Sequence, residues 1–247
     1  MEKEAVIVVD YQNDFANPET GSLYVSGGEK IAGAINKIVS ETKTKGGIVI
    51  SSRELHPAGH ISFASNFKGK ESIIEAFKRG EAPSSKNFIT TEEIEGWSEE
   101  NNGLSPSADF SVEELKAYIA TVGDQAMWPD HCVEGSFGSA FYKDFDSSMV
   151  DIEIKKGFEA DSHPYSAFGG VTMDGKKAMI EVLKEAGVKV LKVVGLATDY
   201  CDIATVMDGI KNDFKVEFIL EASAGVDPAG TIEALRKMRE AGVKIVE

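Results

Sequence analysis

Residues 193–201 read VVGLATDYC, and this stretch decides how the chain folds. The run that leads into it, residues 189–194, is short, apolar and rich in β-branched side chains, which is typical of a buried strand. Small residues then make a turn, and apolar side chains at helical spacing predict a helix from 200 to about 211. A strand that passes directly into a helix indicates a βα unit.

Cys201 falls where this predicted strand gives way to the first turn of the helix. Unpaired backbone N–H groups and the positive end of the helix dipole favour an anion there, so we expect a lowered pKa for the Cys201 thiol. Such a thiol is a candidate nucleophile. The alternative is a small apolar cysteine packed under the helix, because free cysteines are commonly buried and inert.

The same alternation of strand and helix extends outward in both directions. Strands are predicted at residues 5–9, 48–52, 151–154, 189–194, 215–220 and 243–246. Helices are predicted at residues 30–43, 174–186, 200–211 and 228–240. Alternation at this spacing predicts an α/β fold with a doubly wound, mostly parallel six-stranded sheet, helices on both faces and right-handed crossovers.

A segment from about residue 64 to 124 interrupts this rhythm after the second strand. It is rich in Glu, Ser, Lys and Asn, and it holds two predicted helices, at 71–78 and 112–121. Ser111 and Glu114 have the spacing of a capping box before the second of them. We expect one domain over residues 1–247, in which this insertion forms either a lid over the site or a solvated decoration.

Composition and charge exclude several classes of partner. The chain of 247 residues carries a formal net charge of −15, which argues against nucleic acid and anionic membrane surfaces as partners. No apolar run approaches the roughly 20 residues that span a bilayer. Two cysteines and no signal-like start indicate a reducing compartment without disulfides. The charge says little about a small neutral substrate. We therefore expect a soluble cytoplasmic protein.

Chemically active side chains follow four of the predicted strands. Asp10 ends the first strand, Glu54 and His56 follow the second, Lys156 follows the third and Cys201 follows the fourth. The carboxyl ends of parallel strands meet at one edge of the sheet, where α/β proteins bind their ligands. Each residue alone could be a helix cap, a surface histidine or part of a solvated charge run. Their convergence on one edge favours an enzyme.

Four motifs then resemble one known family. They are DYQNDF (10–15), WPDHCVEG (128–135), KG (156–157) and GLATDYC (195–201), of which the last is the most specific. Along nearly the whole chain except the insertion, the sequence resembles the nicotinamidases (pyrazinamidases) of the isochorismatase-like cysteine hydrolases. The resemblance implies metal-dependent hydrolysis of nicotinamide to nicotinic acid and ammonia through a cysteine thioester, a step of NAD salvage.

The resemblance also assigns roles to residues of this chain. It implies a catalytic triad in which Asp10 is the general base, Lys156 supplies positive charge and Cys201 is the nucleophile. The backbone N–H groups of Ala197 and Cys201 would form the oxyanion hole, next to a cis peptide bond between Leu196 and Ala197. The pyridine ring would be walled by three aromatic side chains: Phe15, Trp128 and Tyr165.

By the same resemblance Glu54, His56 and His131 would bind one divalent metal ion, with zinc the first choice and iron or manganese as alternatives. One departure stands out, because the family usually has Asp-x-His-Pro where this chain has Glu54-Leu55-His56-Pro57. Glutamate can bind the same metals, but its extra methylene shifts the carboxylate, and a surface carboxylate is the alternative. His60 is either an occasional extra ligand or a neighbour that does not coordinate. His163 has no assigned role.

Two other functions compete with this one. The first is a metal-free sister amidase of the same superfamily that acts on a carbamoyl or ureido group, although such an enzyme does not need the metal-ligand cluster. The second is a catalytically silent relative that binds a ligand or a partner protein. The oligomeric state is open, and a homo-oligomer is compatible with the sequence.

Overall fold

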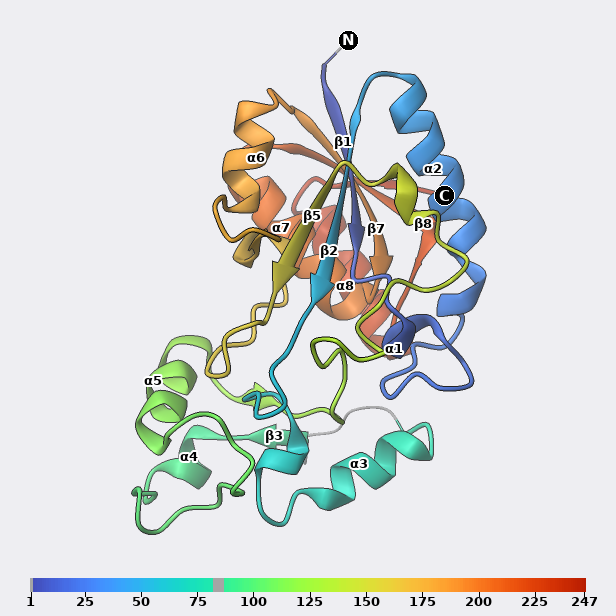
Figure 1. Ribbon diagram of the computed structural model, residues 1–247. Coiled ribbons are helices and arrows are strands. Elements are labelled where there is room, and N and C mark those ends of the chain that lie inside the picture. Colours follow the sequence, from blue (N-terminus) through green and yellow to red (C-terminus); the bar gives the residue numbers. More distant parts are fainter. Residues whose placement is uncertain (1, 82–86) are drawn as a thin grey trace.

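The computed structural model describes residues 2–81 and 87–247, and Figure 1 shows a central twisted sheet with helices packed against it. The strands are β1 (Glu4–Val9), β2 (Ile48–Glu54), β3 (Phe88–Ile89), β4 (Gln125–Ala126), β5 (Ile152–Lys156), β6 (Val171–Thr172), β7 (Val190–Leu196), β8 (Lys215–Ala224) and β9 (Lys244–Val246). The α-helices are α1 (Asn13–Ala16), α2 (Ala32–Thr44), α3 (Glu71–Lys78), α4 (Thr91–Ile94), α5 (Val112–Val122), α6 (Met179–Glu185), α7 (Ile203–Lys211) and α8 (Pro228–Glu240).

The main sheet has the order β6-β5-β2-β1-β7-β8-β9. All neighbours are parallel except β5 and β6, so the six predicted strands form the parallel part and β6 adds an antiparallel edge. This seventh strand escaped prediction because two residues are too short for any periodicity. After β1 the chain builds the sheet toward β2 and β5, and it later returns to the other side of β1 with β7. That reversal is where open α/β sheets form their ligand crevice.

Helices cover both faces of the sheet, as predicted. On one face α2 packs against β1, β2 and β7, and on the other α6, α7 and α8 pack against the alternate side chains of the same strands. Figure 1 shows α2 on one side of the sheet and α6 and α7 on the other. Because both faces are covered, β1 is buried along Ala5–Val9 and has the continuous apolar sequence of such strands.

The junction between β7 and the following helix differs from the expectation in detail. Residues 198–202 form a single π-helical turn, and α7 begins only at Ile203. At Gly195, φ is +127° and a Cβ would lie 2.2 Å from the carbonyl oxygen of Val9, so only glycine lets β7 approach β1 this closely. The predicted helix at 174–186 is also shorter, because residues 174–178 form the turn that follows β6.

The inserted segment, residues 64–124, lies beyond the carboxyl ends of the strands (Figure 1, teal to green). It contains α3, β3, α4 and α5, and α5 begins with the predicted capping box of Ser111 and Glu114. The segment packs around an apolar cluster of its own, whose buried members include Phe67, Leu115 and Ile119. Within the described residues, no helix is long and apolar enough to cross a membrane.

Candidate active site and metal centre

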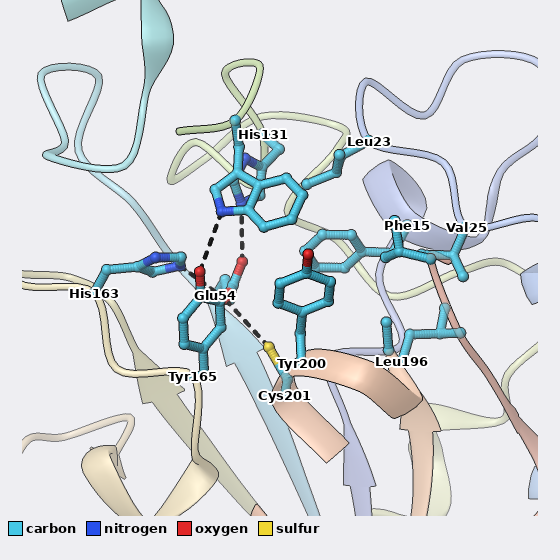
Figure 2. A pocket seen from close by; sticks show the side chains of 13 residues that line it. Phe15, Leu23, Val25, Glu54, His131, His163, Tyr165, Leu196, Tyr200 and Cys201 are labelled. Carbon is cyan, nitrogen blue, oxygen red and sulfur yellow. Dashed lines mark hydrogen bonds and ion pairs between the residues drawn. The ribbon is translucent and has the colours of Figure 1, made fainter. Parts of the chain in front are cut away.

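A cavity opens at the carboxyl ends of β1, β2 and β7. Figure 2 shows the side chains that surround it. Its lining consists of Phe15, Leu23, Val25, Glu54, Trp128, His131, His163, Tyr165, Leu196, Ala197, Tyr200, Cys201 and Val226. Most of these side chains are apolar or aromatic, and the polar ones gather at one end around Glu54.

The structure brings Asp10, Lys156 and Cys201 together from three different elements. The Lys156 Nζ atom lies 3.0 Å from Asp10 Oδ2 and 3.6 Å from Cys201 Sγ. Asp10 ends β1 with φ at +45°, and the Ser52 hydroxyl donates to its Oδ1 atom at 2.7 Å. An unusual backbone conformation held by surrounding contacts is common at functional sites. All three side chains are buried, so their charges interact without much screening by water.

Burial and mutual contact set the protonation of this group. Burial raises the pKa of Asp10, and Lys156 opposes that rise. Burial alone would lower the pKa of Lys156, but Asp10, Cys201 and Glu54 together raise it well above its usual value, so Lys156 keeps its proton. Its ammonium group is therefore a fixed positive charge between the carboxylates and the thiol.

The lowered pKa that the helix start predicts for Cys201 is wrong. Burial raises the pKa of the Cys201 thiol well above its usual range; Lys156 opposes the rise, while Asp10 and Glu54 add to it. The helix dipole of one turn is too weak to offset desolvation of a thiolate next to two carboxylates. Cys201 therefore needs a base to remove its proton. The second cysteine, Cys132, is fully buried in the core, and burial raises its pKa too.

Glu54, His56 and His131 also meet, next to the triad. His56 Nε2 and His131 Nε2 lie 3.2 Å and 3.1 Å from Glu54 Oε2. Their Nδ1 atoms contact backbone carbonyl oxygens, of Gly157 at 2.6 Å and of Pro129 at 2.7 Å. A carbonyl at Nδ1 fixes the proton there and leaves Nε2 as a free donor atom, which is the usual support for a metal-bound histidine.

A fourth side chain, His163, joins this cluster, although the sequence assigned it no role. One ligand atom from each of Glu54, His56, His131 and His163 lies within 4.8 Å of the others. The loop after β5 folds back over the edge of the sheet and brings His163 to the cluster. His163 lies seven residues after the end of β5, and nothing in the sequence of this loop predicts that it folds back. Being on the same edge as Lys156 was the one hint available.

His60, in contrast, lies outside the group of ligand atoms. Its Nδ1 contacts the Ser62 hydroxyl at 2.8 Å, and its Nε2 contacts the Ser162 carbonyl oxygen at 2.8 Å. The His60 ring lies against His56, with centroids 3.9 Å apart. It therefore supports the cluster by packing, and its two nitrogens are already engaged.

The cluster fits a divalent metal ion. The His163 Nε2 atom is buried without a hydrogen-bond partner, an orphan that a cation would satisfy. Three imidazoles and one carboxylate are donors that suit zinc, iron or manganese. Burial raises the pKa of Glu54, but Lys156 and His56 outweigh it and hold that pKa well below its usual value, so the carboxylate is ionised.

Glu54 links the cluster to the triad. While its Oε2 atom faces two histidines, its Oε1 atom lies 2.6 Å from Lys156 Nζ and 3.8 Å from Cys201 Sγ. Glu54 is only 1% exposed, so the surface-carboxylate alternative is excluded. Its position at the end of β2, where it is paired with Lys156 on β5, explains the contact with Lys156.

Phe15, Trp128 and Tyr165 all line the cavity, and Tyr200 is a fourth aromatic that the sequence did not indicate. The Trp128 Nε1–H donates to the Tyr165 hydroxyl at 3.4 Å, and the ring of Trp128 lies edge-on to Tyr200 with centroids 4.8 Å apart. Ala197 borders the cavity beside Cys201, and its peptide bond with Leu196 is cis, as the resemblance implied.

Comparison with known proteins decides the family. The Isochorismatase domain profile matches residues 110–247, more than half of the chain. The chain belongs to the isochorismatase family. Its relatives include the nicotinamidase of Acinetobacter baylyi, 28% identical over 97% of this chain and 90% of that protein. They also include the nicotinamidase/pyrazinamidase of Mycobacterium tuberculosis, 28% identical over 98% of this chain and 97% of that protein.

Solved structures of the isochorismatase family agree with this assignment and confirm the predicted fold class. The crystal structure of the pyrazinamidase of Pyrococcus horikoshii in complex with zinc is 29% identical, with a TM-score of 0.66 over 99% of both chains. A nicotinamidase/pyrazinamidase from Acinetobacter is 28% identical, with a TM-score of 0.71 over 100% of this chain and 97% of that one.

Proposed function

We propose that this isochorismatase-family protein is a metal-dependent nicotinamidase, which hydrolyses nicotinamide to nicotinic acid and ammonia in NAD salvage. One observation carries the proposal: Cys201, which is in contact with the buried Lys156–Asp10 pair, lines the same aromatic cavity as members of the metal-ligand cluster. The group of Asp10, Lys156 and Cys201 supplies the chemistry of amide hydrolysis, and the metal-ligand cluster beside the aromatic walls supplies a site for a flat ring with a basic nitrogen. Relatives named nicotinamidase along nearly the whole chain support it.

The proposed reaction begins with Cys201. As Sγ attacks the amide carbonyl carbon, its proton passes to Asp10, which the raised pKa of the thiol makes necessary. Lys156 keeps its proton and stabilises the negative charge. The backbone N–H groups of Ala197 and Cys201 would bind the oxyanion, which is usually the largest single contribution to such catalysis.

Asp10 then acts as a general acid. It donates its proton to the departing nitrogen, so that the carbon–nitrogen bond breaks, ammonia leaves and a thioester remains on Cys201. A water molecule, deprotonated by Asp10, attacks the thioester, and the carbon–sulfur bond breaks. Nicotinic acid is released, the proton returns to Cys201, and Asp10 is again a carboxylate.

The metal would be held by Glu54, His56 and His131, with zinc the first choice. When bound, it supplies a Lewis-acidic position for the pyridine nitrogen and for ordered water. Phe15, Trp128 and Tyr165 would then hold the ring from its faces and edges, a geometry that excludes water and places the carboxamide near Cys201. This arrangement favours a pyridine carboxamide over the carbamoyl or ureido substrates of a metal-free sister amidase.

The proposal extends to the whole molecule. Residues 1–247 would form one hydrolase domain, in which residues 64–124 are an insertion. Both cysteines are free thiols, which fits a reducing, cytoplasmic location. Its partner is a small molecule, and a homo-oligomer is compatible with these features.

Ammonia release from nicotinamide tests the function directly. We expect the purified protein to release ammonia and nicotinate in equal amounts, and chelation to raise KM more than it lowers kcat, because the metal holds the ring. Restoring zinc should restore KM. Turnover of a ureido substrate but not of nicotinamide would favour the sister amidase, and no turnover of either would favour a silent binding protein.

Glu54 provides a second test, read as metal content per chain. We expect Glu54→Ala to lose the metal, since it removes the one carboxylate of the cluster, and Glu54→Asp to retain it, since aspartate is the usual family residue. Glu134→Ala is the matched control, because Glu134 is exposed three residues after His131. Full occupancy in Glu54→Ala would show that Glu54 is not a ligand.

A further inference from the structure

The His163 side chain has an unusual environment for a buried histidine. Its Nε2 atom has no hydrogen-bond partner, and it lies 3.6 Å from Glu54 Oε1. Figure 2 shows the ring directed from the loop after β5 toward Glu54. Leaving a buried nitrogen without a partner costs free energy. A cation bound among the neighbouring ligand atoms would give this nitrogen a partner and remove that cost.

The inserted segment contacts the backbone of His163 through hydrogen bonds. The Tyr118 hydroxyl on α5 donates to the backbone carbonyl oxygen of His163 and accepts from its backbone N–H, both at 3.1 Å. Next to it, the Gln125 amide of β4 lies 3.4 Å from His163 Nδ1. One residue of the catalytic face is thus fixed at its backbone by a helix that belongs to the insertion.

Tyr118 is itself held firmly. Its helix, α5, begins with the capping box of Ser111 and Glu114, and Leu115 and Ile119 on either side of it are buried in the insertion's apolar cluster. A capped helix with a packed face moves little, so the hydroxyl is a fixed point for the His163 backbone.

We propose that His163 is a fourth protein ligand of the metal, and that residues 64–124 position it through Tyr118. This rests on the metal site of the proposed function and deepens it. The insertion is then neither a simple lid nor a decoration: it supports a ligand that comes from the loop between Lys156 and Tyr165.

The chemistry of the donor set is consistent with this role. Glu54, His56, His131 and His163 supply one carboxylate oxygen and three imidazole nitrogens, and an ion with more than four coordination positions would keep room for the pyridine nitrogen beside them. Ligation through Nε2 requires the proton of His163 on Nδ1.

The test is metal affinity, measured by competition with a chromophoric chelator for zinc, with the absorption spectrum of the cobalt(II) protein as a report of coordination. We expect His163→Ala to bind zinc more than about 100-fold more weakly, and Tyr118→Phe about 10-fold more weakly, the range for outer supports of metal ligands. The cobalt(II) spectrum should change in His163→Ala. His163→Gln keeps most of the side-chain volume and replaces His163→Ala if that variant does not fold.

Tyr24→Phe is the matched control, because the Tyr24 hydroxyl likewise accepts from a backbone N–H, of Gly27, and donates to a neighbour, Glu29. It should leave zinc affinity unchanged. Equal affinity and an unchanged cobalt(II) spectrum in the His163 variants would overturn the ligand assignment while leaving the proposed function intact. Weaker zinc binding in the His163 variants but not in Tyr118→Phe would overturn the role of the insertion. A wild-type protein that binds neither metal would overturn both the inference and the metal dependence.

Discussion

Replacing Cys201 with alanine is expected to lower kcat/KM for nicotinamide by at least about 10⁴-fold, because a methyl group cannot form the thioester. The fold should persist, because Cys201 lies in the wall of the cavity. When its thiol is removed, Lys156 keeps Asp10 and Glu54 as partners, so no buried charge is left unpaired. Ammonia release at saturating and at low nicotinamide measures the loss. Mass spectrometry of the wild-type protein, quenched during turnover, should show the thioester on Cys201 and nowhere else.

Cys132→Ala is the matched control, because Cys132 is the other free thiol but packs in the core behind the metal loop. It should cost mainly stability and leave kcat close to that of the wild type. An alkylating reagent should modify Cys201 slowly, since burial raises the pKa of its thiol, and bound nicotinamide should protect it. Equal modification of both cysteines, unaffected by nicotinamide, would contradict the assignment of the nucleophile.

The second large effect is expected for Asp10→Asn, which should lower kcat by about 10²–10⁴-fold, the usual contribution of a general acid and base. The amide keeps the shape of the carboxyl group and can still accept the Ser52 hydroxyl, and Glu54 remains paired with Lys156, so the protein should lose some stability but stay folded. Without the Asp10 carboxylate, no base is left at that position to accept the proton of Cys201. Steady-state kinetics and a thermal melt, measured on the same preparation, separate these two properties.

Combining the variants sharpens this test. Asp10→Asn together with Cys201→Ala should be hardly slower than Cys201→Ala alone, because residues that act as one unit give strongly non-additive losses. Multiplied losses would mean that Asp10 acts apart from the thiol. Near wild-type turnover in Asp10→Asn would refute its role as the base.

The sequence by itself determined the alternation of the six parallel strands with their helices, because buried strands and amphipathic helices each leave a local periodic pattern. It also placed Asp10, Glu54, Lys156 and Cys201 at one edge of the sheet. That inference needs no side-chain geometry: parallel strands must end at the same edge, so residues that follow them converge. The inserted segment and its capping box were equally visible, since both are local features.

Only the tertiary structure decided how these groups act on one another. The pKa of Cys201 rises because desolvation depends on everything packed around the thiol, which a motif does not encode. Glu54 contacts Lys156 because β2 and β5 are paired in one particular register. His163 joins the metal-ligand cluster because a loop folds back over the sheet edge and Tyr118, 45 residues earlier in the chain, fixes it there. Contacts between distant residues leave no periodicity in the sequence, so the path of that loop, and with it the fourth member of the cluster, exists only in the folded chain.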